Sequence, residues 1–139
     1  MSIPNKAYSA YRENSIATAS PGELTLMLYN GLIRFMTQAQ AAIADRDPAK
    51  AHDNIIKAQN ILKEFIATLD HKYEIADTLA MLYDYMYRRL VEANLKKDAA
   101  IIGEILPMVV ELRDAWNQAL KEMKQHPGQY PAAAMKVAK

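Results

Sequence analysis

The sequence predicts an all-α fold: an antiparallel up-down four-helix bundle with a short N-terminal arm or helical turn. Apolar residues recur at three- and four-residue spacing along four long segments, and no run combines strict alternation with β-branched residues. Glycine and proline occur mainly where these segments begin or end. Short connections place consecutive helices antiparallel, and one apolar stripe on each closes them around a single core.

The first helix is expected over about residues 21–44. Ser20 can cap it, Pro21 suits its first position, and Glu23 completes a capping box. Residues 1–19 contain too few apolar side chains for another bundle helix, so they form the predicted arm. The inward stripe of this helix is predicted at Leu24, Leu28, Gly31, Phe35 and Ala42, widened by Leu32 and Ala39.

The second helix is expected over about residues 48–69, with Asp47 as its cap and Pro48 at its first position. Residues 70–72 are polar and form a turn, after which the third helix covers about residues 73–97. The inward stripe of the second helix is predicted at Ala51, Ile55, Ala58, Leu62, Phe65 or Ile66, and Leu69. That of the third is predicted at Ile75, Leu79, Leu82, Met86, Leu90 and Ala93.

The fourth helix is expected over about residues 99–125, capped by Asp98 and followed by a loose tail at 126–139. Pro107 lies inside it and predicts a kink, because proline lacks an N–H and its ring crowds the carbonyl four residues back. That earlier residue is Gly103, which leaves room for the kink. The inward stripe is predicted at Ile101, Ile105, Met108, Leu112, Trp116 and Met123.

Composition excludes several classes of protein. The 139 residues suit one domain, and the absence of cysteine excludes disulfides and thiolate sites. The N-terminus lacks the apolar run of a signal peptide and no stretch could cross a bilayer, so we expect a cytoplasmic protein that does not insert into membranes. A net charge of +1 provides no global field for nucleic acid.

No motif for catalysis, a cofactor or a metal is found. A di-metal bundle needs a glutamate three residues before a histidine, and Ala49, Thr68 and Met123 precede His52, His71 and His126 instead. The segment from Tyr83 to Arg89 interleaves aromatic and basic residues, but on a helix these side chains point in several directions. We therefore expect no enzyme, no metal and no nucleic-acid partner.

The predicted helices carry more apolar residues than one core needs. A second set lies outside the inward stripes: Leu26, Tyr29 and Ile33 on the first helix, with Met36 between its two stripes, Tyr83, Tyr87 and Asn94 along a shoulder of the third, and Leu106 and Val110 on the fourth. A helix of a soluble bundle normally has one apolar stripe, so something should cover the surplus. The cover could be the chain itself, a second copy, or a segment of a partner.

A further pattern extends, in order, over about residues 5–123. It consists of Tyr8, Tyr11, Asn14, and residues 18–24 (TASPGEL), 27–31 (MLYNG), 57–61 (KAQNI), 81–86 (MLYDYM), 88–90 (RRL), 93–94 (AN) and 112–116 (LRDAW). In these residues and their spacing the chain resembles the FliS family of flagellar secretion chaperones. Asn30 stands where that family often has Asp.

The resemblance implies a cytoplasmic chaperone that binds the disordered C-terminal segment of flagellin, prevents its premature polymerisation and docks on the cytoplasmic domain of the flagellar type III export gate. In the family the client lies partly in apolar grooves, which the N-terminal arm can occupy when the client is absent. A homodimeric helical adaptor that uses the surplus stripe as its own interface is the alternative.

The partner-binding candidates follow from the surplus apolar residues and the resemblance together. The displaceable arm is expected to use Tyr8, Tyr11 and Ile16, and the groove Leu26, Tyr29, Ile33, Tyr83, Tyr87, Leu106 and Val110. Each of these could equally be a core or packed-arm residue. Arg88, Arg89 and Asn94 are candidates for contacts with the client backbone or with the export gate, and the sequence does not separate these roles.

Overall fold

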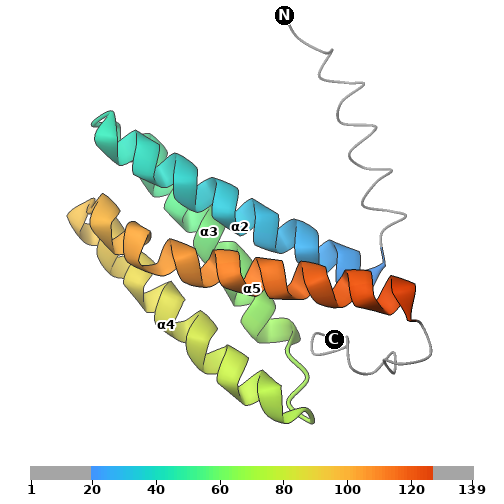
Figure 1. Cartoon of the computed structure of the whole chain (residues 1–139). Helices are drawn as coiled ribbons and strands as arrows, with labels where there is room; N and C mark the ends of the chain where they lie inside the picture. The colour runs from blue at the N-terminus through green and yellow to red at the C-terminus, as the bar shows by residue number, and fades with distance from the viewer. Residues whose placement is uncertain (1–19, 127–139) are drawn as a thin grey trace, which may run out of the picture.

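The computed structural model describes residues 20–126, which form a ring of four antiparallel helices (Figure 1). The helices are α2 (Pro21–Ala44), α3 (Pro48–Thr68), α4 (Glu74–Lys96) and α5 (Ala99–Gln125). Each packs against its two neighbours in the ring, so that α2 and α4 each contact α3 and α5. The predicted all-α bundle is confirmed. The arm, predicted at 1–19, and the tail, predicted at 126–139, fall outside the described residues, except for the first residue of the tail.

Side-chain caps fix the start of three helices. The Ser20 hydroxyl accepts from the Glu23 N–H at 3.2 Å, and the Glu23 carboxylate accepts from the Ser20 N–H at 3.3 Å, which is the predicted capping box. Asp47 and Asp98 cap α3 and α5 by accepting first-turn backbone N–H groups at 3.1 and 2.9 Å. The helix starts at these three positions are thus set by local sequence.

Two of the chain reversals use a left-handed backbone at residues other than glycine. Arg46 has φ 57° in the turn after α2, and Lys97 has φ 49° at the end of α4. The left-handed conformation at the end of a helix is usually taken by glycine, because a Cβ raises its energy. Both turns therefore carry a small conformational cost.

The core confirms the predicted stripe of α3 and corrects that of α4. In α3 the buried apolar residues are Ala51, Ile55, Ala58, Leu62 and Phe65, and Leu69 just beyond the helix is buried too. In α4 they are Ala76, Tyr83, Met86, Leu90 and Ala93. Ile75 was predicted inward but is 56% exposed, whereas the small Ala76 faces the core. Periodicity favours the larger of these two adjacent apolar residues, and the structure buries the smaller one.

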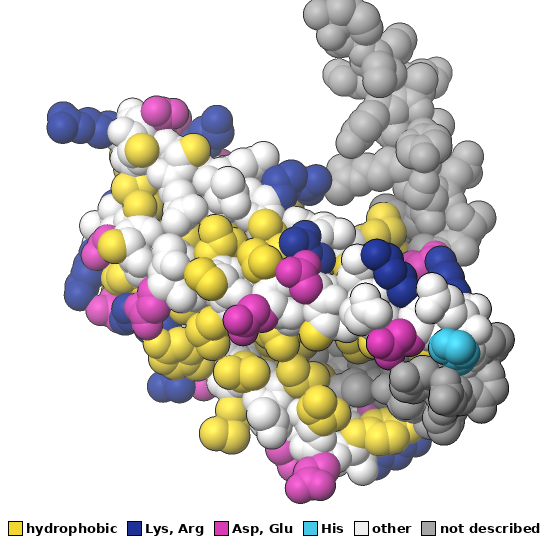
Figure 2. Space-filling model, viewed as in Figure 1, with side chains coloured by type: hydrophobic (Ala, Val, Ile, Leu, Met, Phe, Trp, Pro, Cys, Tyr) yellow, Lys and Arg dark blue, Asp and Glu magenta, His cyan; other side chains and the backbone are white. Residues whose placement is uncertain are grey.

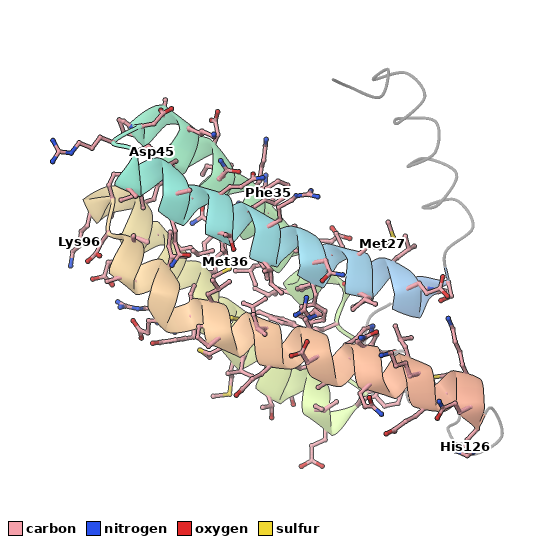
Figure 3. The ribbon with its side chains drawn as sticks, turned by 45° about the horizontal axis from the view of Figure 1, so that its top comes forward. Met27, Phe35, Met36, Asp45, Lys96 and His126 are labelled. Carbon is pink, nitrogen blue, oxygen red and sulfur yellow. The ribbon has the colours of Figure 1, made fainter. Side chains whose placement is uncertain are left out.

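Helix α2 is rotated relative to its predicted orientation. Its buried residues are Tyr29, Leu32, Met36, Ala39 and Ala42. Only Ala42 of the main predicted stripe is buried, while Leu28 and Phe35 pack half-buried at the edge of the core. Figure 3 shows Met36 directed toward the interior of the bundle, with Phe35 on the opposite edge of the helix. The side of α2 that faces the core therefore lies between the two predicted apolar stripes.

Helix α5 presents its N-terminal half to the core and continues across its proline. Its buried residues are Ile101, Ile102, Ile105 and Val109, whereas the predicted inward residues Met108, Leu112, Trp116 and Met123 are half-buried. Pro107 is exposed and does not end the helix. A Cβ at Gly103 would come within 3.4 Å of the Gln40 amide nitrogen, so α2 approaches α5 closely there.

Candidate partner-binding face

Five of the predicted groove residues lie on the two adjacent helices α2 and α5, and four of these remain partly open to solvent. We call the surface that these four define the α2–α5 face. Its members, Leu26, Ile33, Leu106 and Val110, are all half-buried. Ile33 and Leu106 pack partly against the core. Figure 2 shows apolar side chains gathered along the line between these two helices. Residues distant in sequence are thus brought to one side of the bundle.

Polar contacts fix the register of the α2–α5 face. The Trp116 indole N–H donates to the Gly22 carbonyl at 2.8 Å, and the Arg113 guanidinium donates to the Asn30 side chain at 2.9 Å. Because Gln40 lies against Gly103, the two helices are aligned over most of the length of α2. In this antiparallel register, Ile33 falls at the level of Val110, and Leu106 lies one turn further along α5.

Two other predicted groove residues, Tyr29 and Tyr83, are core residues, which corrects their expected position. Each is 3% exposed, and their hydroxyl oxygens lie 2.5 Å apart in a buried hydrogen bond. The Phe65 ring lies between them, with ring centroids 4.7 Å from Tyr29 and 5.2 Å from Tyr83. Burial raises the pKa of both tyrosines, so both hydroxyls stay neutral. Neither side chain is available on the surface to a partner.

The remaining described candidates, Tyr87 and Asn94, lie on the side of α4 that faces α3. The Tyr87 ring is half-buried, and the Lys63 ammonium lies 5.6 Å from its centroid. The Asn94 side chain shares a hydrogen bond of 2.8 Å with the His52 ring and accepts from the Lys97 ammonium at 2.7 Å. These two residues are therefore separate from the α2–α5 face. Tyr8, Tyr11 and Ile16 lie outside the described residues.

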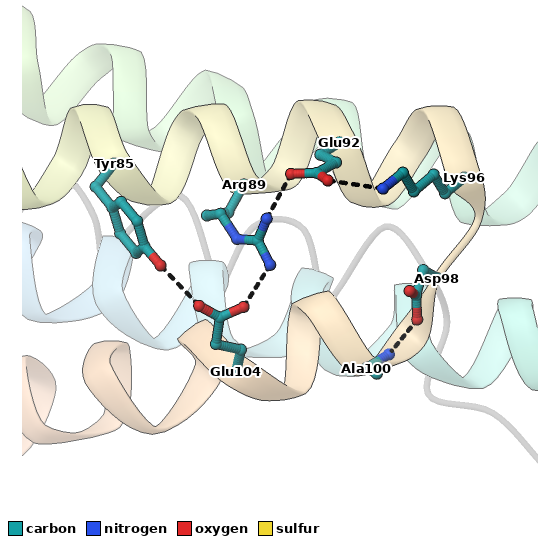
Figure 4. A network of polar contacts seen from close by, with 7 residues as sticks. All are labelled: Tyr85, Arg89, Glu92, Lys96, Asp98, Ala100 and Glu104. Carbon is teal, nitrogen blue, oxygen red and sulfur yellow. Dashed lines mark hydrogen bonds and ion pairs between the residues drawn. The ribbon is translucent and has the colours of Figure 1, made fainter.

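A polar network joins α4 to α5 on another side of the ring (Figure 4). The Tyr85 hydroxyl donates to Glu104 at 2.7 Å, and Arg89 bridges Glu104 and Glu92. The hydrogen bond from Tyr85, followed by that from Arg89, lowers the pKa of Glu104. Arg89 is thus held within the protein rather than free for a partner. Arg88 is exposed and pairs with Asp84 at 3.0 Å.

Sequence reasoning missed several exposed apolar residues. The large apolar side chains left exposed among the described residues are Met27 on α2, Ile56 on α3, and Ile75, Met81, Tyr85, Val91 and Leu95 on α4. Most of them belong to α4, on which the predicted inward stripe was misplaced at its N-terminal half. A stripe drawn through Ala76 and Tyr83 would have placed Met81 and Leu95 on the outer surface.

The described residues offer little for small-molecule or metal chemistry. An open recess of about 330 Å³ is lined by Ile43, Arg46, Asp47, Pro48 and Lys97, none of which is a predicted site residue. Within residues 20–126, no three acidic, histidine or cysteine side chains come together as a set that could hold a metal ion. None of the helices in this part of the chain combines the length and apolar character that crossing a bilayer requires.

Comparison with known proteins identifies the family. The family model described as flagellar protein FliS matches residues 4–123. The chain is 46% identical over 125 residues to the flagellar secretion chaperone FliS of Bacillus subtilis (strain 168), covering 90% of this chain and 93% of that protein.

More distant relatives bear the same name. The flagellar secretion chaperone FliS of Salmonella typhimurium (strain LT2) is 36% identical over 117 residues, covering 81% of this chain and 87% of that protein. The one from Campylobacter jejuni is 34% identical over 116 residues, covering 82% and 91%. These matches span the bundle and agree with the resemblance carried by the sequence motifs. The chain belongs to the FliS family of flagellar secretion chaperones and is a chaperone, not an enzyme.

Proposed function

We propose that this protein is a cytoplasmic chaperone that binds the disordered C-terminal segment of flagellin, prevents it from polymerising prematurely and delivers it to the flagellar export gate. The observation that carries this proposal is the α2–α5 face, an apolar surface on a protein of a secretion-chaperone family. A disordered client gains stability by folding an apolar stripe against such a surface.

The α2–α5 face is suited to a helix or an extended strand that runs parallel to the helix axes. Leu26, Ile33, Leu106 and Val110 keep part of each side chain open to solvent. Each square ångström of apolar area that a client covers contributes about 25 cal/mol. Ordering the client costs about 2–5 kcal/mol or more, so a contact along the length of the face is needed rather than a single pocket. Covering its apolar stripe would also keep the client from pairing with another flagellin.

The arm is proposed to occupy the same face when no client is bound. Helix α2 begins at Pro21, within two turns of Leu26, so the segment that precedes the helix is joined to it near one end of the face. Its apolar side chains, Tyr8, Tyr11 and Ile16, could cover the face and be displaced by flagellin. In this proposal, arm and client compete for one surface.

Isothermal titration with a peptide spanning the C-terminal segment of flagellin tests the position of the client. Replacing Ile33→Ser and Val110→Ser together should weaken binding by about tenfold or more, or about 1.4 kcal/mol, because apolar contacts are lost at the centre of the face. Ile56→Ser is the matched control, since Ile56 is 37% exposed on α3 and does not belong to this face. Equal affinity of the double variant and the control would exclude the α2–α5 face.

Delivery to the export gate requires a separate test. The complex of chaperone and flagellin peptide should bind the purified cytoplasmic domain of the gate. Arg88→Ala is the first variant to compare. The Arg88 side chain is exposed and, among the described residues, pairs only with the nearby Asp84. Failure of the loaded complex to bind the domain would remove delivery from the proposal and leave client binding intact.

A further inference from the structure

On the side where α4 meets α5, the bundle is closed at one end and open at the other. Figure 1 shows the two helices diverging toward the end at which α4 begins and α5 finishes. The polar contacts from Tyr85 and Arg89 to Glu104 join the middle and second half of α4 to the first half of α5 (Figure 4). These contacts therefore hold the closed end, and the first half of α4 and the second half of α5 form the open end.

One side of α5 is buried in the first half of the helix and partly open in the second half. Ile105 and Val109 are 0% exposed and face the core. Leu112, Ala119 and Met123 follow on the same side, at spacings of three, four or seven residues, and are only half-buried. Because the side of the helix is the same, the difference comes from what lies opposite, and α4 is further away at this end.

The matching side of α4 shows the same change. Leu82 and Arg89 lie seven residues apart on one side of the helix, and Arg89 reaches Glu104 of α5. Toward the start of α4 this side continues with Leu79 and Ile75. Leu82 and Leu79 are half-buried, and Ile75 is 56% exposed. We call these apolar residues of the two helices the open-end face: Ile75, Leu79, Leu82, Leu112, Ala119 and Met123.

We infer that residues 127–139 of this chain bind the open-end face. They follow α5 directly, and α5 finishes at Gln125, at the open end of the bundle. Pro127 and Gly128 favour a reversal of the chain, which directs the segment back along α5. Thirteen residues span up to about 43 Å when extended, whereas Leu112 lies about 20 Å from the end of α5. The segment is long enough to cover the whole face.

The composition of the segment suits this face. Beyond the reversal it contains Tyr130, the alanines at 132–134, Met135 and Val137. When the segment runs back from the end of α5, the large Tyr130 meets the widest part of the open end first. The alanines then reach the part where α4 and α5 come closer together and only small side chains fit. Apolar area removed from water contributes about 25 cal/mol for each square ångström.

Charge at the open end also matches the segment. The charged side chains of the segment, Lys136 and Lys139, are both basic. Glu74, next to Ile75 in sequence, is exposed and has no partner among the residues that the structure describes. An exposed ion pair adds little affinity, but it favours a basic segment over an acidic one. The apolar contacts therefore provide the affinity, and Glu74 contributes to the choice of occupant.

The open-end face is separate from the surface proposed for flagellin. It is formed by α4 and α5, whereas the α2–α5 face is formed by α2 and α5, and the two faces share no residue. The segment after α5 and the arm before α2 are thus assigned to different surfaces. The inference does not depend on the identity of the client.

A spin label in the full chain tests the inference. The chain contains no cysteine, so Ala138→Cys provides one site for a nitroxide. The label should broaden the methyl signals of Ile75 and Leu79 in NMR spectra. Those of Leu95 should remain sharp, because Leu95 lies about 30 Å from Ile75 along α4. Mixing spin-labelled protein with isotope-labelled protein that lacks the spin label should cause no broadening, since the contact is within one chain.

A substitution on the face provides the second measurement. Ile75→Ser should reduce the broadening at Leu79 and speed trypsin cleavage after Lys136 by about fivefold, because lost apolar contact frees the segment. Met81→Ser is the matched control, since Met81 is 74% exposed on another side of α4 and should change neither result. Circular dichroism verifies that each variant is folded.

Four outcomes would overturn the inference. They are sharp Ile75 and Leu79 signals in the labelled protein, broadening of Ile33 and Val110 in their place, broadening in the mixture, and equal cleavage of Ile75→Ser and Met81→Ser. Broadening at the open end that Ile75→Ser reduces and Met81→Ser does not would support it.

Discussion

At the scale of residues, the Tyr29 and Tyr83 pair is the main polar contact inside the core. Each hydroxyl is shielded from water and has the other, 2.5 Å away, as its hydrogen-bond partner. Tyr83→Phe should therefore lower the free energy of unfolding by about 1–3 kcal/mol, because it leaves the Tyr29 hydroxyl buried without a partner. The double variant Tyr29→Phe and Tyr83→Phe should lose less than the single one, since it removes both polar groups. Urea unfolding measures all three proteins, and a double variant that loses the sum of two single changes would contradict this account.

The same pair predicts a dependence of stability on alkaline pH. Burial holds the pKa of Tyr29 and Tyr83 above the ordinary value of 10.0. A raised pKa in the folded state contributes stability that is complete below the ordinary pKa and is lost as the pH rises above it, because the unfolded chain then ionises first. The free energy of unfolding should fall above pH 10 in the natural protein and fall less steeply in the double phenylalanine variant. Parallel curves would show that other groups control the alkaline limit.

Arg46 is a position at which a substitution should stabilise the protein rather than destabilise it. Its φ of 57° is unfavourable for a residue with a Cβ, and no hydrogen bond or ion pair holds its side chain among the described residues. Arg46→Gly should raise the free energy of unfolding by about 0.5–1 kcal/mol, because glycine accepts the left-handed conformation without steric cost. Arg46→Ala keeps the Cβ and serves as the control. Thermal unfolding compares the three proteins, and equal gains in both variants would point to charge rather than backbone.

At the scale of elements, helix starts could be predicted and helix rotations could not. Ser20, Asp47 and Asp98 act over two or three residues, so their capping function can be read locally. The rotation of α2 depends on which of two adjacent apolar stripes finds the better fit against three other helices. Tyr29 belongs to the second of these stripes and Met36 lies between the two, and periodicity alone does not decide which of these positions faces the core. Tertiary contacts made that choice.

Pro107 makes a prediction about α5 as an element. Proline cannot donate the helical hydrogen bond to the carbonyl of Gly103, and both residues lie on the exposed side of the helix. Pro107→Ala should restore that bond and raise the free energy of unfolding by about 1 kcal/mol or more. Glu111→Ala, one turn later on the exposed side, is the control for helix propensity alone. If Pro107→Ala stabilised the helix but reduced flagellin-peptide binding, the proline would serve the client rather than the fold.

At the scale of the whole molecule, coupled folding of a client should leave a calorimetric signature. Binding of the flagellin peptide should have a negative heat-capacity change, because apolar surface on the chaperone and on the peptide becomes buried together. Titration at several temperatures provides this value directly. The Ile33→Ser and Val110→Ser double variant should show a smaller change in magnitude. Binding with no heat-capacity change would show that charged contacts, rather than the α2–α5 face, hold the client.

The bundle itself was predictable because its signals are local and repeated. The candidate site was less predictable, because the burial of Tyr29 depends on the rotation of α2, that of Tyr83 on the rotation of α4, and both on the contact between them across the core. The antiparallel register of α2 and α5 brings four other members to one side of the bundle: Leu26, Ile33, Leu106 and Val110. On α4, Ile75 is predicted to face the core and is exposed instead, because the smaller Ala76 beside it takes the inward position.

The capping box at the start of α2 has a mechanical consequence for exchange of partners. Ser20 and Glu23 satisfy each other's backbone N–H groups with their own side chains. The first turn can thus stay wound whether or not the chain before it is attached to the bundle. One bound segment can then replace another without unfolding the start of α2. The free energy of binding of the incoming segment is therefore not reduced by the cost of refolding that turn.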